Sequence, residues 1–166
     1  MKKLWMIGIS LLMAGCVTVG EKGKKVEGPI EGVVGRPLRS YSMTIDTEYD
    51  PRLDDLVAGY KLLPVTIQNR HLSGIPMDVE KDRWMVVTEK GKKVEAINSL
   101  KLRDPILWRS LPKSLRSAID YPEVIPINYT ATFDLIFPSK INIRYFSEIR
   151  YYNAALNKEF ILKKED

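Results

Sequence analysis

The residue types that most often carry enzymatic chemistry are sparse in this chain of 166 residues. His71 is the only histidine, so any Ser–His–Asp or Cys–His site must use it, yet it lies in the turn-like stretch NRHLSG. Asp78, Glu80 and Asp82 alternate, which predicts the solvated face of a strand, because Arg83 stands where a calcium loop needs glycine. A zinc site needs three or four convergent ligands, usually His or Cys, and this chain has one of each. We therefore predict no catalytic residue, no metal and no cofactor.

The single cysteine, Cys16, directly follows an apolar segment. Lys2 and Lys3 precede ten largely apolar residues, 4–13. As a helix this segment reaches about 15 Å, roughly half of a ~30 Å hydrocarbon core, so it is too short to span a bilayer. Basic, apolar and small residues in this order indicate an export signal, residues 1–15. One cysteine also excludes an intramolecular disulfide and a thiolate metal cluster.

Residues 12–16, LMAGC, resemble the lipobox of bacterial lipoproteins. The resemblance implies that the signal peptidase recognises Leu12, Met13, Ala14 and Gly15, and that Cys16 is the lipidation site, where acyl chains hold the protein on the bilayer. Met13 stands where leucine is usual, which predicts slower processing. Two alternatives stay open: an ordinary signal peptidase releases a soluble protein, or the segment is never cleaved.

The residues after Cys16 predict a tether and a location. Residues 17–37 hold five glycines and two prolines without apolar periodicity, so 16–37 is predicted to be a lipidated N-terminus with a flexible linker. Lipoproteins kept in the inner membrane usually carry Asp after the cysteine. Val17 therefore implies an extracytoplasmic anchor, on the periplasmic face of the outer membrane if the organism has two membranes.

The charge of the chain is mildly basic. The formal net charge is +5, and removing residues 1–15 leaves 24 basic and 21 acidic residues, or +3. The basic residues are interleaved with acids, as in EKGKKVE and KKED, and are interpreted as solvated surface. This excess of basic over acidic residues is far below that of a nucleic-acid-binding protein, so no nucleic-acid partner is expected.

Residues 38–166 predict one all-β domain. The clearest strand, 127–137, alternates between apolar and polar residues. A second, 60–69, contains Pro64, which predicts an edge or a bulge. Residues 84–88 and 93–97 predict a hairpin with Gly91 in its turn. Further predicted strands are 39–45, 75–79, 141–145, 149–153 and 159–162. Short strands at this spacing are typical of an antiparallel Ig-like β-sandwich.

A short helical insert interrupts the strands at residues 104–120. Asp104 before Pro105 is a good helix start, and PKSLRSAI predicts a second helical turn. Four apolar residues of the insert are expected to cap one end of the sandwich: Leu107, Trp108, Leu111 and Leu115. No role of this insert in function is predicted.

Three stretches, VTIQN, WMVVTEKGKKVEA and YTATFDLIFP, resemble the Ig-like domains of uncharacterised bacterial lipoproteins, which are described as telokin-like. The resemblance covers residues 55–153, and the helical insert departs from the simplest version of the pattern. It implies no catalytic residues.

Aromatic residues are the remaining signal, because Tyr145, Phe146, Tyr151 and Tyr152 cluster late in the chain. Adjacent strand residues face opposite sides, so one residue of each pair is expected in the core and the other on the surface. Exposed tyrosines suit protein or glycan contacts. Tyr145, Tyr151 and Tyr152 are therefore the candidate partner surface, and ordinary cross-strand packing is the alternative.

Together these patterns predict a membrane-anchored lipoprotein of the bacterial cell envelope that is a non-catalytic binding or structural module. Its expected contacts are the lipid bilayer, through acyl chains on Cys16, and an envelope protein or glycan. One alternative is a small envelope hydrolase that uses His71 and acidic residues. Another is an accessory subunit of an envelope complex, which a sizeable exposed apolar patch would favour.

Overall fold

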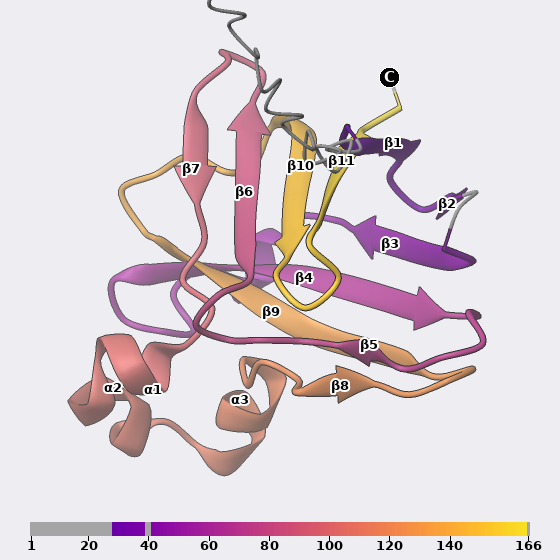
Figure 1. The fold of residues 1–166 in the computed structure, drawn as a ribbon. Coiled ribbons are helices and arrows are strands. Elements are labelled where there is room, and N and C mark those ends of the chain that lie inside the picture. The colour runs from indigo at the N-terminus through magenta and orange to yellow at the C-terminus, as the bar shows by residue number, and fades with distance from the viewer. Residues whose placement is uncertain (1–27, 39–40, 166) are drawn as a thin grey trace, which may run out of the picture.

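The computed structural model describes residues 28–38 and 41–165. The predicted signal peptide, its recognition residues 12–15 and the predicted lipidation site Cys16 lie outside the described residues. Two sheets pack face to face, and their strands cross at a large angle (Figure 1). The predicted β-sandwich is therefore confirmed. Among residues 28–38 and 41–165, no helix combines the length and the apolar character needed to cross a membrane.

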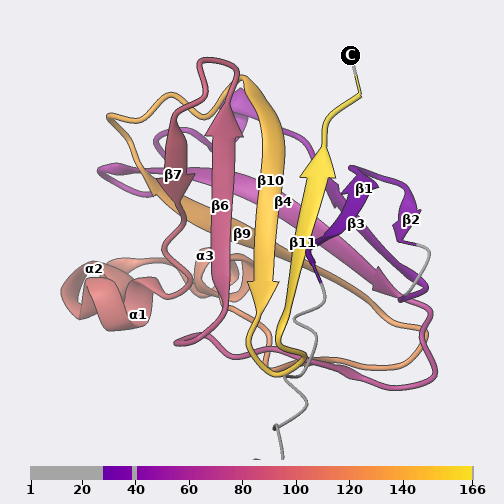
Figure 2. The ribbon, with the colours of Figure 1, turned by 45° about the horizontal axis from the view of Figure 1, so that its top comes forward.

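The first sheet has the strand order β1-β11-β10-β6-β7, with β10 in its centre (Figure 2). Strands β6 and β7 form the predicted hairpin, with Gly91 in its turn at φ +74°. The bounds of the strands are β1 Ile30–Val33, β6 Arg83–Thr88, β7 Lys93–Glu95, β10 Phe146–Asn153 and β11 Lys158–Lys163.

Strand β1 corrects the predicted linker, which was expected to extend to residue 37. Residues Ile30–Val33 instead pair with β11, in parallel, with Ile30 opposite Phe160. Gly32 permits this packing, because a Cβ atom there would lie 2.3 Å from Leu38 Cδ2. Residues 30–33 therefore belong to the folded domain, and Gly32 serves close packing against Leu38.

The second sheet has the order β2-β3-β4-β9, with bounds β2 Pro37–Leu38, β3 Met43–Thr47, β4 Tyr60–Asn69 and β9 Thr130–Pro138. Strand β4 is central, yet it contains Pro64. The pairing of β3 with β4 ends at Thr47 and Val65, so Pro64 lies just past the end of its neighbour. At this position the missing N–H of proline removes no hydrogen bond between β3 and β4. The Pro64 carbonyl accepts a hydrogen bond from the Thr47 hydroxyl at 2.7 Å.

The clearest predicted strand begins three residues later than expected. Asn128 has φ +59°, and Tyr129 N–H bonds to the Pro126 carbonyl in a turn, so β9 begins at Thr130. Its predicted core face, Phe133, Leu135 and Phe137, is buried. A small third sheet pairs β5, Ile75–Pro76, with β8, Val124–Ile125.

The predicted strand 141–145 is wrong. Ile141 N–H bonds to the Pro138 carbonyl, and the Asn142 side chain accepts a hydrogen bond from Arg144 N–H at 3.0 Å. These local bonds make a loop that leads into β10. Tyr145 therefore lies at the end of a loop, directly before the strand.

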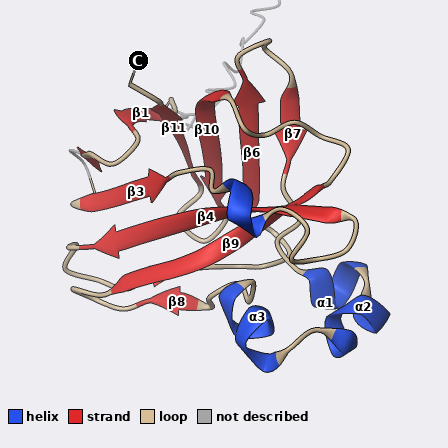
Figure 3. Ribbon diagram, turned by 180° about the vertical axis from the view of Figure 1, so that it is seen from behind, coloured by secondary structure: helices blue, strands red, loops and turns tan. Residues whose placement is uncertain are grey.

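The helical insert consists of α1 Leu100–Arg103, α2 Pro105–Ser110 and α3 Lys113–Ala118; a 3-10 helix, η1, covers Pro51–Leu53. The Asp104 carboxylate accepts a hydrogen bond from Leu107 N–H at 3.0 Å, which confirms the predicted helix start. The helices lie beside β9 (Figure 3) and form a second apolar cluster with Leu62 and Ile136. They cover the outer face of β4 and β9, whereas the cap was expected over one end of the sandwich.

Candidate functional site

His71 has no acidic partner in the described part of the chain. Its Nδ1 atom lies 2.9 Å from Ser73 Oγ, two residues away, and its ring centroid lies 6.3 Å from that of Tyr41. Ser73 N–H also points to the same ring nitrogen, at 3.3 Å. These are contacts within one turn, and no carboxylate among the described residues orients the imidazole as a catalytic base requires.

Asp82 overturns the prediction of a solvated acidic face. Residues 79–81 form a turn, so the alternation of side chains between the two faces of a strand does not apply here. Asp82 is accordingly free to point inward, and it is only 3% exposed. Its Oδ2 atom accepts hydrogen bonds from the hydroxyls of Tyr121, at 2.9 Å, and Tyr151, at 3.1 Å. Its Oδ1 atom accepts from Ala154 N–H at 2.8 Å. The carboxylate thus joins three segments far apart in sequence.

The same buried cluster contains Tyr151, which was predicted to belong to a partner surface. Tyr151 is 0% exposed, and its ring stacks on Trp84 at 4.0 Å between centroids. Burial, reinforced by the neighbouring Asp82 carboxylate, raises the pKa of Tyr151, so its hydroxyl stays protonated and donates. The prediction for Tyr151 is wrong, and this cluster holds the core together.

Tyr152 is only half-buried, but its hydroxyl donates to Asn157 Oδ1 at 2.9 Å and closes the turn between β10 and β11. Tyr145 is 53% exposed, whereas the adjacent Phe146 is 2% exposed. The expected division between core and surface is therefore correct for Tyr145 and Phe146, whereas Tyr152, beside the buried Tyr151, is only half-buried. Of the three candidate tyrosines, Tyr145 is the one that presents its side chain to solvent.

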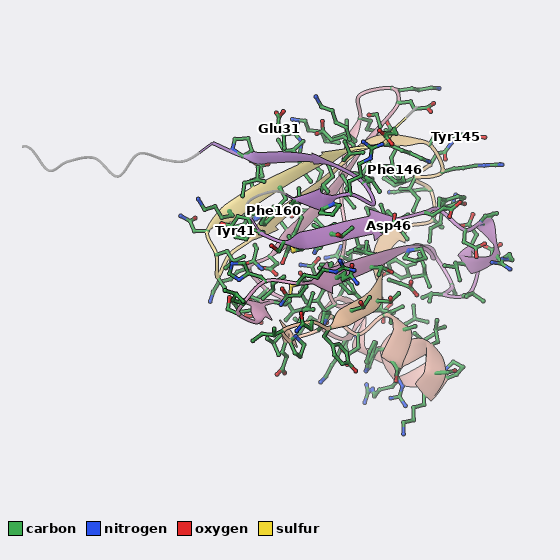
Figure 4. All side chains as sticks on the ribbon, turned by 90° about the vertical axis from the view of Figure 1, so that its right-hand side faces the viewer. Glu31, Tyr41, Asp46, Tyr145, Phe146 and Phe160 are labelled. Atoms are coloured by element: carbon green, nitrogen blue, oxygen red, sulfur yellow. The ribbon has the colours of Figure 1, made fainter. Side chains whose placement is uncertain are left out.

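Tyr145 stands between two hollows at one end of the sandwich (Figure 4). The first hollow has a volume of about 260 Å³, and its lining is Thr88, Glu89, Lys90, Lys92, Lys140, Ile141, Asn142 and Tyr145. The second hollow has a volume of about 220 Å³, and its lining is Glu89, Tyr145, Phe146, Ser147, Lys164 and Glu165. We call the two hollows and Tyr145 together the Tyr145 end.

Positive charge gathers at the Tyr145 end. Its five cations are Lys90, Lys92, Lys140, Arg144 and Lys164, and none lies within 4.0 Å of a carboxylate of the described chain. Of the acids there, Glu165 already accepts a hydrogen bond from Arg36 at 2.7 Å. The five cations therefore create a positive potential that attracts anions. Sequence patterns missed this, because the cations come from three segments.

The first described strand, β1, begins in the middle of the first sheet. Ile30 lies level with Phe160 in the middle of the first sheet, and β1 then runs toward Lys163, which is level with Glu148 near the Tyr145 end. In Figure 4, Glu31 and Phe160 lie on one side of the molecule and Tyr145 on the other. Ile30, where β1 begins, therefore lies away from Tyr145.

A further hollow, of about 470 Å³, lies on the outer face of β3 and β4 and is acidic, with Asp46, Glu48 and Asp50 in its lining. Arg52 donates to both carboxylate oxygens of Asp50 and lowers the pKa of that carboxyl. Within residues 28–38 and 41–165, no group of three or more His, Cys, Asp or Glu is arranged to hold a metal ion.

Asp134, on the outer face of β9, makes stability depend on pH. Partial burial raises the pKa of its carboxyl to about 6, above the usual value for aspartate. The protonated form therefore favours the fold, and the free energy of unfolding should fall as the pH rises from about 4 to 6. Asp134→Asn should remove this slope and stabilise the protein by about 1 kcal/mol at pH 7.5, allowing for solvent screening.

Urea unfolding between pH 4 and pH 7.5 measures this effect. The matched control is Asp46→Asn, which removes an exposed carboxylate from the same sheet and should keep the slope. An unchanged slope in Asp134→Asn would show that other groups cause the pH dependence.

Comparisons with known proteins show no family for this chain. No protein-family model matches the chain, and no curated protein matches it. The chain is similar to a solved structure described as an uncharacterized beta-sandwich protein from Clostridium difficile 630, at 13% sequence identity and a TM-score of 0.36. The match covers 86% of this chain and 99% of that chain.

Proposed function

We propose that the chain is a lipid-anchored, non-catalytic binding module of the bacterial cell envelope, related to the telokin-like lipoproteins. In this proposal Cys16 carries the acyl chains and the β-sandwich stands outside the cytoplasm. In an organism with two membranes, the anchor lies in the periplasmic face of the outer membrane. The lipobox-like residues 12–16 support the anchor.

The observation that carries the binding role is the exposed Tyr145 between two hollows, the first of which is lined by Lys90, Lys92 and Lys140. Thirteen residues separate Cys16 from Ile30. If flexible, a chain of this length has a root-mean-square reach of about 20 Å. A tether of this reach leaves the domain free to turn, so an envelope protein or glycan can reach the Tyr145 end.

The anchor is tested by replacing its only acceptor. Wild type in a bacterial host should incorporate an alkyne analogue of palmitate and appear at the mass of the chain that begins at Cys16. Cys16→Ser should incorporate none and should keep its leader. Both are measured by click labelling and mass spectrometry of the full chain.

Met13→Leu is the matched control, because it restores the usual lipobox residue and leaves the acceptor in place. We expect it to be processed at least as fast as wild type. Label retained in Cys16→Ser, or an unlabelled wild type released by cleavage, would contradict the lipid anchor.

The binding role is tested by photo-crosslinking in cells with a benzophenone amino acid at position 145. The control position is Tyr129, a tyrosine of similar exposure, 62% against 53%, in the turn before β9. A discrete crosslinked species from position 145 and none from position 129 is the expected result. Equal patterns from the two positions would contradict a specific role of the Tyr145 end.

A further inference from the structure

The five cations of the Tyr145 end outnumber its two acids, Glu89 and Glu165. They come from the turn of the β6–β7 hairpin, from the loop before β10 and from the C-terminal residues. Glu89 N–H bonds to the Tyr145 carbonyl at 3.4 Å, which ties the hairpin turn to this loop. The site is therefore held by backbone contacts between two loops, and a bound anion does not have to order them.

The aromatic ring at the centre of this site is held in place. The Arg144 guanidinium lies 5.3 Å from the centroid of the Tyr145 ring, a cation–π contact, and the neighbouring Phe146 is buried in the core. A side chain with this support loses little conformational entropy when it binds. Its exposed surface is free to stack against a flat apolar surface, such as one face of a sugar ring.

The size of the hollows limits the ligand. Volumes of about 260 and 220 Å³ are below the roughly 300–1,000 Å³ of pockets for drug-sized ligands, so each hollow suits one sugar-sized unit. The two hollows share Tyr145 and Glu89, so two units bound there would be neighbours. A protein partner is less suited to this end, because lysine is depleted from the centres of protein interfaces.

We propose that the Tyr145 end binds a linear anionic glycan, with Tyr145 stacked on one sugar ring, a carboxylate or phosphate group in the first hollow and part of the neighbouring unit in the second. This inference rests on the proposed function as a binding module and names the chemical class of its partner. Lys90, Lys92 and Lys140 hold the anion in the first hollow, and the second hollow, lined by Glu89, Lys164 and Glu165, receives an uncharged part of the neighbouring unit.

The test uses the purified full-length chain in detergent micelles and four fluorescent probes of equal length. These probes are octagalacturonate, which carries carboxylates, a phosphorylated maltooctaose, neutral maltooctaose and octathymidylate. Fluorescence anisotropy gives the affinities. We expect one or both anionic glycans to bind at least tenfold more tightly than maltooctaose, with an affinity that falls as salt is raised. The anionic glycan that binds more tightly shows whether the site prefers carboxylate or phosphate.

Two variants test the residues. Tyr145→Ala should weaken glycan binding about fivefold through loss of stacking, and Lys92→Ala with Lys140→Ala should weaken it further and flatten the salt dependence. The matched control, Lys101→Ala with Arg103→Ala, removes the same charge from α1 and should leave the affinity unchanged. Circular dichroism of each variant confirms that the fold is retained.

Three results would overturn the inference: neutral maltooctaose binding as tightly as the anionic glycans, octathymidylate binding more tightly than both, or wild-type affinity in Tyr145→Ala. Crosslinking from position 145 to a protein, with no glycan bound, would leave the binding module intact and overturn only the glycan. Palmitate labelling of Cys16 is independent of every arm of this test.

Discussion

Asp82→Ala is expected to destabilise the protein by about 4 kcal/mol. The substitution leaves the Tyr121 hydroxyl and the N–H groups of Asp78 and Ala154 without their acceptor inside the protein. The Tyr151 hydroxyl keeps only the weak acceptor Met77 Sδ, at 2.9 Å. Each unsatisfied buried donor costs about 1–3 kcal/mol, and water that enters the space offsets part of the total. Because domains are stable by only about 5–15 kcal/mol, this is a large loss.

Urea unfolding followed by tryptophan fluorescence measures the effect, since Trp84 donates to Tyr121 within the same cluster. Glu80→Ala is the matched control, because Glu80 is an exposed acid in the adjacent turn and its loss should change stability by less than about 0.5 kcal/mol. If the two variants were equally stable, the buried carboxylate would not be what joins these segments.

Ile136→Ala is expected to cost about 3 kcal/mol and to loosen the helical insert. Ile136 is 0% exposed although it faces away from the main core, because the helices pack over it together with Leu62, Leu100 and Leu111. Truncation of a buried isoleucine to alanine costs about 2–5 kcal/mol through lost burial and the cavity left behind. The cavity lies under the insert, so the insert should open first.

Amide hydrogen exchange with mass spectrometry distinguishes local opening from global loss of stability. Exchange in residues 100–118 should accelerate more than exchange in β10 and β11. Thr130→Ala, an exposed position on the same face of β9, should leave both unchanged. Uniform acceleration throughout the domain would show that the insert and the sandwich unfold as one unit.

Local patterns in the sequence were sufficient for the architecture. Alternation along Phe133, Leu135 and Phe137, and the glycine turn at Gly91, predicted core strands and a hairpin that the structure contains. These features depend on neighbours within a few residues, where a period of two or a positive φ leaves a direct trace. The start of α2 at Asp104 was predicted for the same reason.

Features that depend on distant segments were not predictable. The sequence of β1 predicts a linker, because the strand is stabilised by pairing with β11, more than a hundred residues later. The sequence around Asp82 predicts a surface residue, because the tyrosines that donate hydrogen bonds to it, Tyr121 and Tyr151, follow 39 and 69 residues later. A buried acid is tolerated only where such donors converge, and that convergence leaves no local pattern.

The candidate site divides in the same way. By itself the sequence determined that Tyr151 and Tyr152, neighbours on one strand, face opposite sides, that the lysines are polar surface residues, and that Cys16 is the predicted acceptor of a lipid. Only the tertiary structure decided that Tyr151 is core and that Tyr145 stands among cations from three separate segments. The physical reason is that the orientation of a side chain follows from its own strand, whereas burial and electrostatic potential are sums over every segment that folds beside it.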